Sequence, residues 1–360
     1  MNIKDRYIAK TLFSFTAMVL IIWLGVYSFF NFLEEMNSVG RSAYTSLQAI
    51  NYIVLKMPDV IYSQSSSIIL LGCVLGMGHL ATSNQLIVMQ ISGVSILQIT
   101  IFTIKIALIF IFILIFIGEI IAPLSSEQAE KGRAKALGIS DIAKNQDGFW
   151  IKDGQNFINV KKNLDGKLFF DISIFEINLS NSIKTVTTAE SAKFEGQALE
   201  MVNAEIFSID DSIYIDNIAT KKSNSLIKTV EFDSTLIDSL RKSPSDLTTW
   251  TIIRRIQYLS ANKLKSDGFE IELYKRLVRP FTLVAMILLA MIFIFGSNRT
   301  TTLGKKIFFG ISLALSFEMI SRIGSAMSLG FDFNPIIITT LPTFIVMFIA
   351  AVILIRKSVV

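Results

Sequence analysis

The stretch ILQITIFTIKIALIFIFILIFIGEIIA at residues 96–122 decides the fold class, because only two of its residues, Lys105 and Glu119, are charged. A helix needs about 20 mostly apolar residues to cross a bilayer core about 30 Å thick. The stretch therefore predicts a transmembrane helix, Ile96–Ala122. Five further stretches of similar length predict five more transmembrane helices, at Leu12–Leu33, Val54–Leu80, Leu277–Phe295, Ile307–Leu329 and Ile336–Ile355.

The bulk composition agrees with a multi-pass α-helical membrane protein of six transmembrane helices. Hydrophobic residues make up 52% of the chain and the mean hydropathy is +0.56. The first apolar stretch exceeds the roughly 7–15 residues of a signal-peptide core, so we expect it to be retained as a helix. The single cysteine, Cys73, excludes a disulfide within the chain.

Lys and Arg near the predicted helix ends set the orientation, since cytoplasmic loops collect these residues. One side of the predicted bundle holds Lys4, Arg6, Lys10, Arg299, Lys305, Lys306, Arg356 and Lys357. We therefore expect both termini, and with them the loop at about Thr82–Ser95, to be cytoplasmic. The polar middle of the chain is then expected to lie outside the membrane.

The polar middle, from about Asp141 to Leu240, alternates apolar and polar residues as strands do. Asp171–Ile174 shows this alternation, and the turn signal Lys152-Asp153-Gly154 is typical of a hairpin. The pattern predicts an all-β sandwich or jellyroll-like domain with one apolar and one wet face.

Three domains follow from this organisation. Residues 1–124 are expected to hold the first three transmembrane helices and a short cytoplasmic helix at about 82–93. Residues 125–245 would hold the β domain with its connecting helix. Residues 246–360 would hold an amphipathic linking helix, about Leu247–Lys265, and the last three transmembrane helices.

The distribution of charge argues against nucleic-acid binding. Residues 147–240 carry a net charge of −6, whereas the remainder of the chain carries +11. A nucleic-acid binder would concentrate positive charge in its polar domain, and this chain does the reverse.

Catalysis is poorly supported by the sequence. The chain has one histidine, His79, and shows neither a phosphate-binding loop, a metal-spaced His/Cys cluster nor a Gly-x-Ser-x-Gly motif. We expect no catalytic residue, metal or cofactor. If transport or signalling consumes energy, another chain must supply the nucleotide site.

The predicted cytoplasmic loop contains a short helix. Thr82 and Gln85 have the spacing of a capping box, and Gly93 is a plausible stop. Such a short helix is not stable alone in water, and its apolar side chains, Leu86, Val88, Met89 and Ile91, suggest a partner. The alternative, that the helix lies flat in the membrane interface, stays open on these residues alone.

A basic cluster follows the third predicted transmembrane helix on the outer side. It comprises Lys131, Arg133 and Lys135, with Arg41 on the same side of the membrane. One interpretation is a solvated helical stalk with pairs such as Glu127 to Lys131. The other is a site for anionic lipid headgroups, because the planar guanidinium of Arg binds phosphate with two hydrogen bonds.

Four motifs in this order resemble the lipopolysaccharide-export permeases of Gram-negative bacteria, the LptF/LptG family, along nearly the whole chain. They are DRYIAK at 5–10, LIVMQISG at 86–93, GEIIAP at 118–123 and GFWIKDGQNF at 148–157. The residues of these motifs are more similar to the G-type than to the F-type branch of the family.

The resemblance implies an inner-membrane permease that works with named partners. In the family, an F-type permease (LptF) and a G-type permease sit on a cytoplasmic ATPase dimer (LptB). Lipopolysaccharide leaves the outer leaflet of the inner membrane and reaches a periplasmic β-jellyroll domain. It then passes to a single-helix jellyroll protein (LptC) and a periplasmic bridge (LptA).

The resemblance also implies roles for particular residues. The segment 82–93 looks like the family's coupling helix, so Thr82, Gln85, Leu86, Met89 and Gln90 are expected at the ATPase. Arg133 matches a basic position of the family and is expected at the lipid headgroup, together with the candidates Arg41, Lys131 and Lys135.

This chain departs from the family pattern in two places. Gln85 stands where the family usually has an acidic residue, and Asn31 and Ser38 stand where well-known members have Lys. Arg41 is the nearest basic residue that could replace those lysines.

Three alternatives remain on the sequence. The chain could be the F-type paralogue, a membrane-anchored envelope sensor with a ligand-binding β domain, or an intramembrane enzyme. A sensor lacks a cytoplasmic stretch long enough for a signalling module. An enzyme would need paired catalytic groups in the membrane, and Glu318 with Arg322 at i,i+4 is typical of a structural pair.

Overall fold

The computed structural model describes residues 3–138, 148–164, 167–178, 182–209, 218–232, 236–237, 242–296, 303–331 and 333–359. The expected ends of the β domain, Asp141 and Leu240, and the loop residue Arg299 lie outside the described residues. The chain forms two compact units. A helical unit comprises the chain up to Val39, Ser46–Glu130 and Asp267 onward, and a β unit comprises Gly40–Thr45 and Lys131–Ser266.

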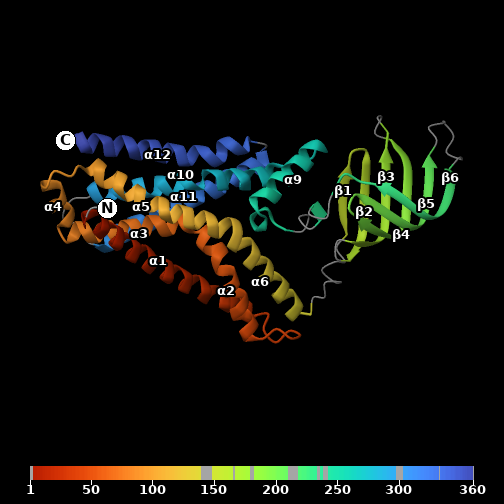
Figure 1. Ribbon diagram of the computed structural model, residues 1–360, viewed down its shortest axis with the longest axis horizontal. Coiled ribbons are helices and arrows are strands. Elements are labelled where there is room, and N and C mark those ends of the chain that lie inside the picture. The colour runs from red at the N-terminus through yellow and green to blue at the C-terminus, as the bar shows by residue number, and fades with distance from the viewer. Residues whose placement is uncertain are drawn as a thin grey trace. The chain divides into compact units, whose positions relative to one another are not determined.

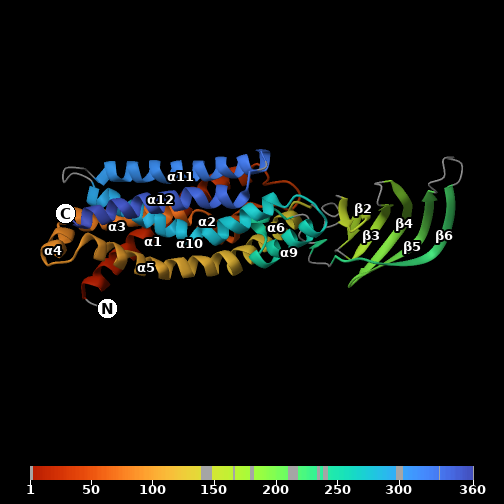
Figure 2. The ribbon, with the colours of Figure 1, turned by 90° about the horizontal axis from the view of Figure 1, so that it is seen from above.

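Long helices form the first unit (Figure 1). They are α1 (Ile3–Met36), α2 (Ser46–Ser63), α3 (Ser65–Thr82), α4 (Gln85–Ile91), α5 (Ile96–Phe116), α6 (Ala122–Ala136), α10 (Asp267–Gly296), α11 (Leu303–Phe331) and α12 (Pro335–Val359). Helix α3 packs against α1, α10 and α11 and contributes the fully buried Leu70, Met77 and Leu80. The core of the bundle is therefore built around α3. Figure 2 shows the same helices from above.

Five helical segments of the described chain are long and apolar enough to cross a membrane by length and composition. They are Asp5–Met36, Ser65–Thr82, Ile96–Ala136, Asp267–Phe295 and Pro335–Ser358. The expected span Ile307–Leu329 lies within α11, a helix of 29 residues. Within α11, Arg322 Nε donates to Glu318 Oε1 at 3.0 Å, so the expected structural pair is present.

The expected second span, Val54–Leu80, is not one helix. Helices α2 and α3 meet at Gln64, whose backbone leaves the helical conformation (φ −94°, ψ 6°). The polar residues Ser63 and Ser65 flank this junction, and each hydroxyl donates to a carbonyl of the preceding turn. Polar side chains thus satisfy backbone carbonyls where the helix changes direction. Inside a membrane no water is available to do so.

The sequence predicts that the third transmembrane helix ends at Ala122, but in the structure the helix continues beyond this residue. A π-helical turn, η1 (Ile117–Ile121), joins α5 to α6, and the Ala122 N–H donates to the Ile117 carbonyl five residues back. Pro123 follows directly. Proline lacks an N–H and clashes with the carbonyl four residues earlier in a regular helix. The wider π turn relieves this clash, so the helix continues to Ala136.

An antiparallel sheet of six strands dominates the described part of the second unit. Its strands are β1 (Phe149–Asp153), β2 (Asn156–Leu164), β3 (Leu168–Ile177), β4 (Ile183–Glu195), β5 (Ala198–Ile209) and β6 (Ile218–Thr229). They lie in the order β1 to β6, each paired with the next along the chain. The unit also holds a 3₁₀ turn, Pro244–Asp246, and α9 (Thr249–Ala261), which corresponds to the expected linking helix.

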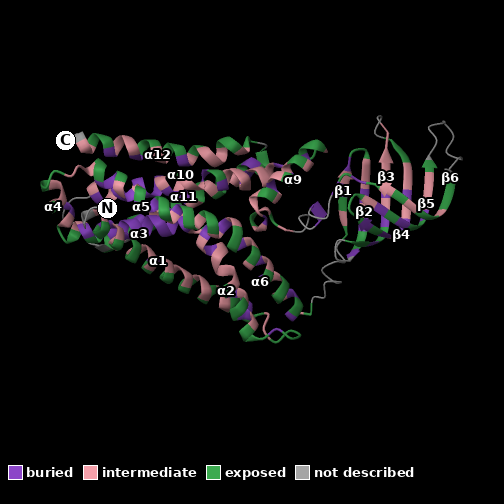
Figure 3. Cartoon of the chain, in the orientation of Figure 1, coloured by how far each residue is buried: buried purple, intermediate pink, exposed green. Residues whose placement is uncertain are grey.

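The inner face of the sheet is apolar, as the alternation predicts. Ile151 pairs with Ile158 and Ile158 with Ile174, and all three are buried. In Figure 3 buried and exposed residues alternate along the strands. Buried residues after β6 pack on the same core, namely Val230, Phe232, Leu236 and Ile237.

The outer face differs from the wet face that was expected. A half-buried apolar row crosses four strands, where Phe157 pairs with Phe175, Phe175 with Val186, and Val186 with Phe207. Trp150 stacks on Phe175 with the ring centroids 5.7 Å apart. Alternation alone missed this row because its members are separated in sequence and meet only through strand register.

Candidate functional site

The structure confirms a short helix, α4, in the segment between α3 and α5, but corrects its start. The N-cap is Asn84, in the left-handed conformation (φ 61°), and its side chain makes no cap hydrogen bond. Thr82 Oγ1 instead donates to the His79 carbonyl at 3.0 Å, so Thr82 and Gln85 form no capping box. The α3 helix runs through Thr82, which leaves that hydroxyl bonded within α3.

The end of α4 is as the sequence predicts. Gly93 has φ +87°, which favours glycine. Its N–H donates to the Gln90 carbonyl at 2.9 Å and the next N–H, from Val94, donates to the Met89 carbonyl at 3.1 Å. This pair of bonds is a Schellman motif, which stops the helix and turns the chain toward α5.

The two faces of α4 have different environments. Leu86 is 3% exposed and belongs to the core of the bundle, and Met89 packs against that core. Val88 is 61% exposed and Ile91 is 81% exposed. Together with the exposed Asn84 they lie at i, i+4 and i+7, so one outward stripe follows the helix.

The stripe formed by Asn84, Val88 and Ile91, called the α4 stripe below, changes the expectation for partner contact. Of the residues expected at the ATPase, Thr82 is exposed, Gln85 and Gln90 are half-buried, and Leu86 anchors α4 to the bundle. Sequence reasoning did not separate the two sides of α4 because both are apolar. The spacing of Val88 and Ile91 was the available signal.

The basic candidates gather in the β unit. The segment Gly40–Thr45 meets the end of α6, where the Ala43 N–H donates to the Ala136 carbonyl at 3.0 Å. Tyr44 is buried and fixes this segment. Gly138 (φ +67°) approaches Ser42 so closely that a β-carbon there would lie 2.7 Å from the Ser42 Oγ.

This contact brings residues distant in sequence to one place. Arg41 lies in the segment that meets the end of α6, and Arg133 and Lys135 occupy the last turn of α6. Arg41, Lys131 and Lys135 are exposed and Arg133 is half-buried. Cationic side chains in the last turn of a helix also interact favourably with the negative end of the helix dipole. They have this structural role whether or not they bind lipid. Exposed ammonium and guanidinium groups in one place can in addition bind phosphate oxygens.

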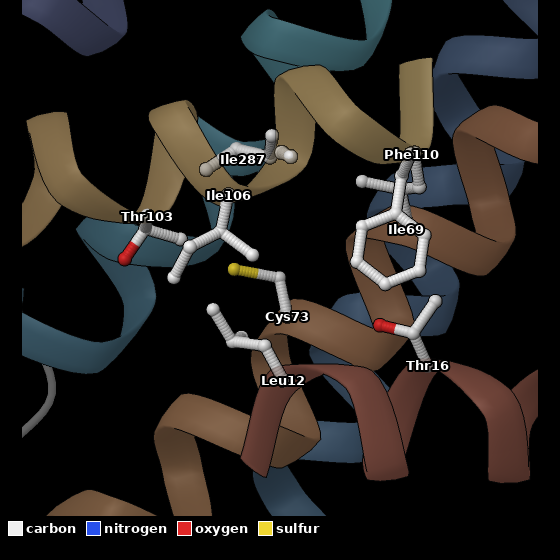
Figure 4. A pocket seen from close by; sticks show the side chains of 9 residues that line it. Leu12, Thr16, Ile69, Cys73, Thr103, Ile106, Phe110 and Ile287 are labelled. Carbon is white, nitrogen blue, oxygen red and sulfur yellow. The ribbon is translucent and has the colours of Figure 1, made fainter. Parts of the chain in front are cut away.

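The helical unit contains a small internal cavity of about 20 Å³ (Figure 4). Thr16, Cys73, Thr103 and Ile106 face it from three helices. This volume is room for about one water molecule, so the cavity is far too small for an acyl chain.

Comparison with known proteins matches this architecture along its whole length. The family described as lipopolysaccharide export system permease LptF/LptG matches residues 6–357. Lipopolysaccharide export system permease protein LptG of Escherichia coli strain K12 is 26% identical over 359 residues, 99% of each chain. The protein of the same name from Haemophilus influenzae is 29% identical over 326 residues, 89% of each chain. The chain therefore belongs to the LptF/LptG family of lipopolysaccharide export system permeases.

Proposed function

We propose that this permease extracts lipopolysaccharide from the outer leaflet of the inner membrane and passes it to a periplasmic β-jellyroll bridge, driven by a separate cytoplasmic ATPase. The observation that carries the proposal is the α4 stripe. An exposed apolar stripe on a helix held to the bundle by the buried Leu86 is suited to receive motion from a partner.

The proposed topology has six membrane spans, with α11 as the fifth. Both termini and α4 face the cytoplasm and the β unit faces the periplasm, as the distribution of Lys and Arg favours. The domains are then 1–124, 125–245 and 246–360. The sheet would be one part of a jellyroll-like domain, with its apolar inner face toward lipid.

The proposed partners follow the family. An F-type permease (LptF) stands beside this chain, an ATPase dimer (LptB) lies below it, and LptC and LptA continue the path. Lipid passes between the two permeases.

The headgroup site is proposed at Arg41, Lys131, Arg133 and Lys135. Their collection at the end of α6 supports it, because lipid A headgroups carry phosphates. The residues proposed for coupling are Thr82, Gln85, Gln90 and the α4 stripe, with Leu86 and Met89 as the support beneath them.

The α4 stripe is tested by the double variant Val88→Asp, Ile91→Asp. Both side chains are exposed, so the bundle should keep its melting temperature, while buried carboxylates at the interface should release the ATPase. Co-elution of the ATPase with the detergent-solubilised permeases is the measurement.

Leu86→Ala provides the matched control on the same helix. It removes core packing at a cost of about 2–5 kcal/mol and should lower the melting temperature. Full ATPase occupancy on the double aspartate variant would rule out coupling through this stripe.

A further inference from the structure

Two helix interruptions in the helical unit lie at the same level. One is the α2–α3 junction at Gln64 and the other is the π turn η1 between α5 and α6. They touch directly, because Gly118 of η1 lies against the ring of Tyr62, the residue next to the last of α2. A β-carbon at Gly118 would overlap that ring, so only glycine permits this approach.

Beyond the interruptions, α2 and α6 remain linked to each other. The Glu130 carboxylate on α6 accepts a hydrogen bond from Tyr52 Oη at 3.1 Å and pairs with Lys56 Nζ at 3.2 Å, both on α2. The Lys56 side chain is largely buried in this pair. Figure 1 shows α2 (orange) and α6 (yellow) turned away from the direction of α3 and α5. We call α2 and Ala122–Glu130 of α6 the α2–α6 arm.

Arg279 of α10 contacts the first interruption, at the junction of α2 and α3. Its guanidinium carbon lies 4.3 Å from the centroid of the Tyr62 ring, a cation–π contact. Its Nη1 donates to the Tyr62 carbonyl and lies 3.4 Å from both the Ser63 carbonyl and Ser65 Oγ. Carbonyls at the end of a helix need such donors, and here one side chain from a third helix supplies them.

Arg276, one turn earlier on α10, closes the second interruption. Its side chain is only 4% exposed. Nε donates to Glu272 Oε1 at 3.1 Å and Nη1 lies 3.7 Å from Glu119 Oε1 in η1. The buried guanidinium thus links η1 to α10 through Glu119, and replacing it with a neutral side chain removes this link.

We propose that Arg276 and Arg279 are positioning residues for lipid export: they hold the hinge of the α2–α6 arm, which swings about η1 and Gln64 during each transport cycle. The inference rests on the proposed function. Two interruptions at one level let two helices turn together, while continuous helices on either side stay rigid. The arginines set the resting position, and release of their contacts shifts the population toward the swung state.

The test uses the complete complex purified with the F-type permease and the ATPase, in liposomes containing lipopolysaccharide. The variants are Arg276→Gln and Arg279→Gln, compared with Arg276→Lys and Arg279→Lys, which keep the charge. The readout is lipopolysaccharide transferred to a soluble acceptor per ATP hydrolysed. We expect the Gln variants to lose roughly 3- to 30-fold in this ratio while ATP turnover persists, with partial recovery in the Lys variants.

A second readout reports the arm itself. In a Cys73→Ala background, spin labels at Leu47 on α2 and Met319 on α11, both exposed, measure the distance between arm and bundle. We expect a second distance to appear with a non-hydrolysable ATP analogue in the wild type, and without nucleotide in Arg276→Gln.

The outcomes separate the two levels of inference. No ATP-dependent transfer by the wild-type complex would overturn the proposed function. Transfer by the wild type with an unchanged ratio in both Gln variants would overturn the hinge alone. The Gln variants could fail to assemble into the complex. In that case the spin labels in the otherwise wild-type complex decide, and a distance that does not change with nucleotide would overturn the hinge.

Discussion

Arg133 is half-buried near the end of α6, whereas Lys131 and Lys135 on the same helix are exposed. The half-buried guanidinium is the one that can hold a phosphate in a fixed geometry, because fewer water molecules compete for its donors. We therefore expect Arg133→Glu to weaken photo-crosslinking of lipopolysaccharide to this chain more than Lys131→Glu does.

A benzophenone side chain placed at the exposed Ala43, in the same segment as Arg41, would report that crosslinking and leave the four proposed residues in place. Lys131→Glu is the control because it makes the same change of charge on the same helix. Equal crosslinking yields from the wild type and both variants would show that the basic residues do not bind the headgroup and act only at the end of the helix.

Asp153, at the end of β1, is expected to make the stability of the β unit depend on pH. Burial raises the pKa of its carboxyl, an effect only partly opposed by the Glu231 N–H that donates to it at 3.2 Å. The folded state then holds its proton to higher pH than the unfolded state. Stability should fall as pH rises from about 3.8 through the raised pKa.

Asp153→Asn should remove this loss of stability at higher pH, because the amide carries no charge. Its oxygen can still accept the hydrogen bond from the Glu231 N–H. Thermal unfolding of the full chain between about pH 4 and pH 7 measures it. A β-unit transition with the same pH dependence in both proteins would show that Asp153 does not cause it.

At the scale of elements, the phenol of Tyr258 on α9 contacts the edge of the sheet at β1. Tyr258 Oη donates to the Lys152 carbonyl at 2.6 Å and accepts the Lys152 N–H at 3.1 Å, so it replaces a missing strand beside β1. Tyr258→Phe leaves both backbone groups without this partner at a cost of about 1–3 kcal/mol. We expect faster hydrogen exchange at the Lys152 amide.

Ile227→Val is a suitable control, because Ile227 lies exposed on β6 at the opposite edge. Unchanged exchange at Lys152 in Tyr258→Phe would mean that water or another group satisfies that edge equally well.

The sequence predicts most of the elements because they follow from hydrophobic length and alternation. The span Ile96–Ala122 and the apolar inner face of the sheet are of this kind. The junction at Gln64 and the π turn before Pro123 were not predicted, because a local change of hydrogen bonding within an apolar run leaves hydropathy unaltered. The polar residues Ser63, Gln64 and Ser65 mark the first of these in the sequence, but polarity alone indicates only side chains that face away from lipid.

The candidate site was predicted less completely than the fold. Segment 82–93 and the basic residues were found by composition and family motifs. The side of α4 that faces outward depends on how Leu86 packs into the bundle, and the meeting of Arg41 with the end of α6 depends on a contact between Ala43 and Ala136. Both are tertiary facts with no local pattern.

At the scale of the whole molecule, the two units suit the physical problem of lipid export. Each buried methylene contributes about 0.8 kcal/mol to membrane anchoring, so a lipid with several acyl chains does not cross water unaided. We propose that the helical unit and the β unit cover the acyl chains in turn. In the proposed mechanism the energy of ATP hydrolysis by the partner enters this chain at α4.

Transfer of lipopolysaccharide from liposomes to a soluble acceptor, with the complete complex and ATP, tests this account most directly. We expect transfer only with hydrolysable ATP, loss of transfer when Val88 and Ile91 are replaced by Asp, and no ATP hydrolysis by this chain alone. Transfer that continues without the ATPase, or at full rate with the double aspartate variant, would contradict it.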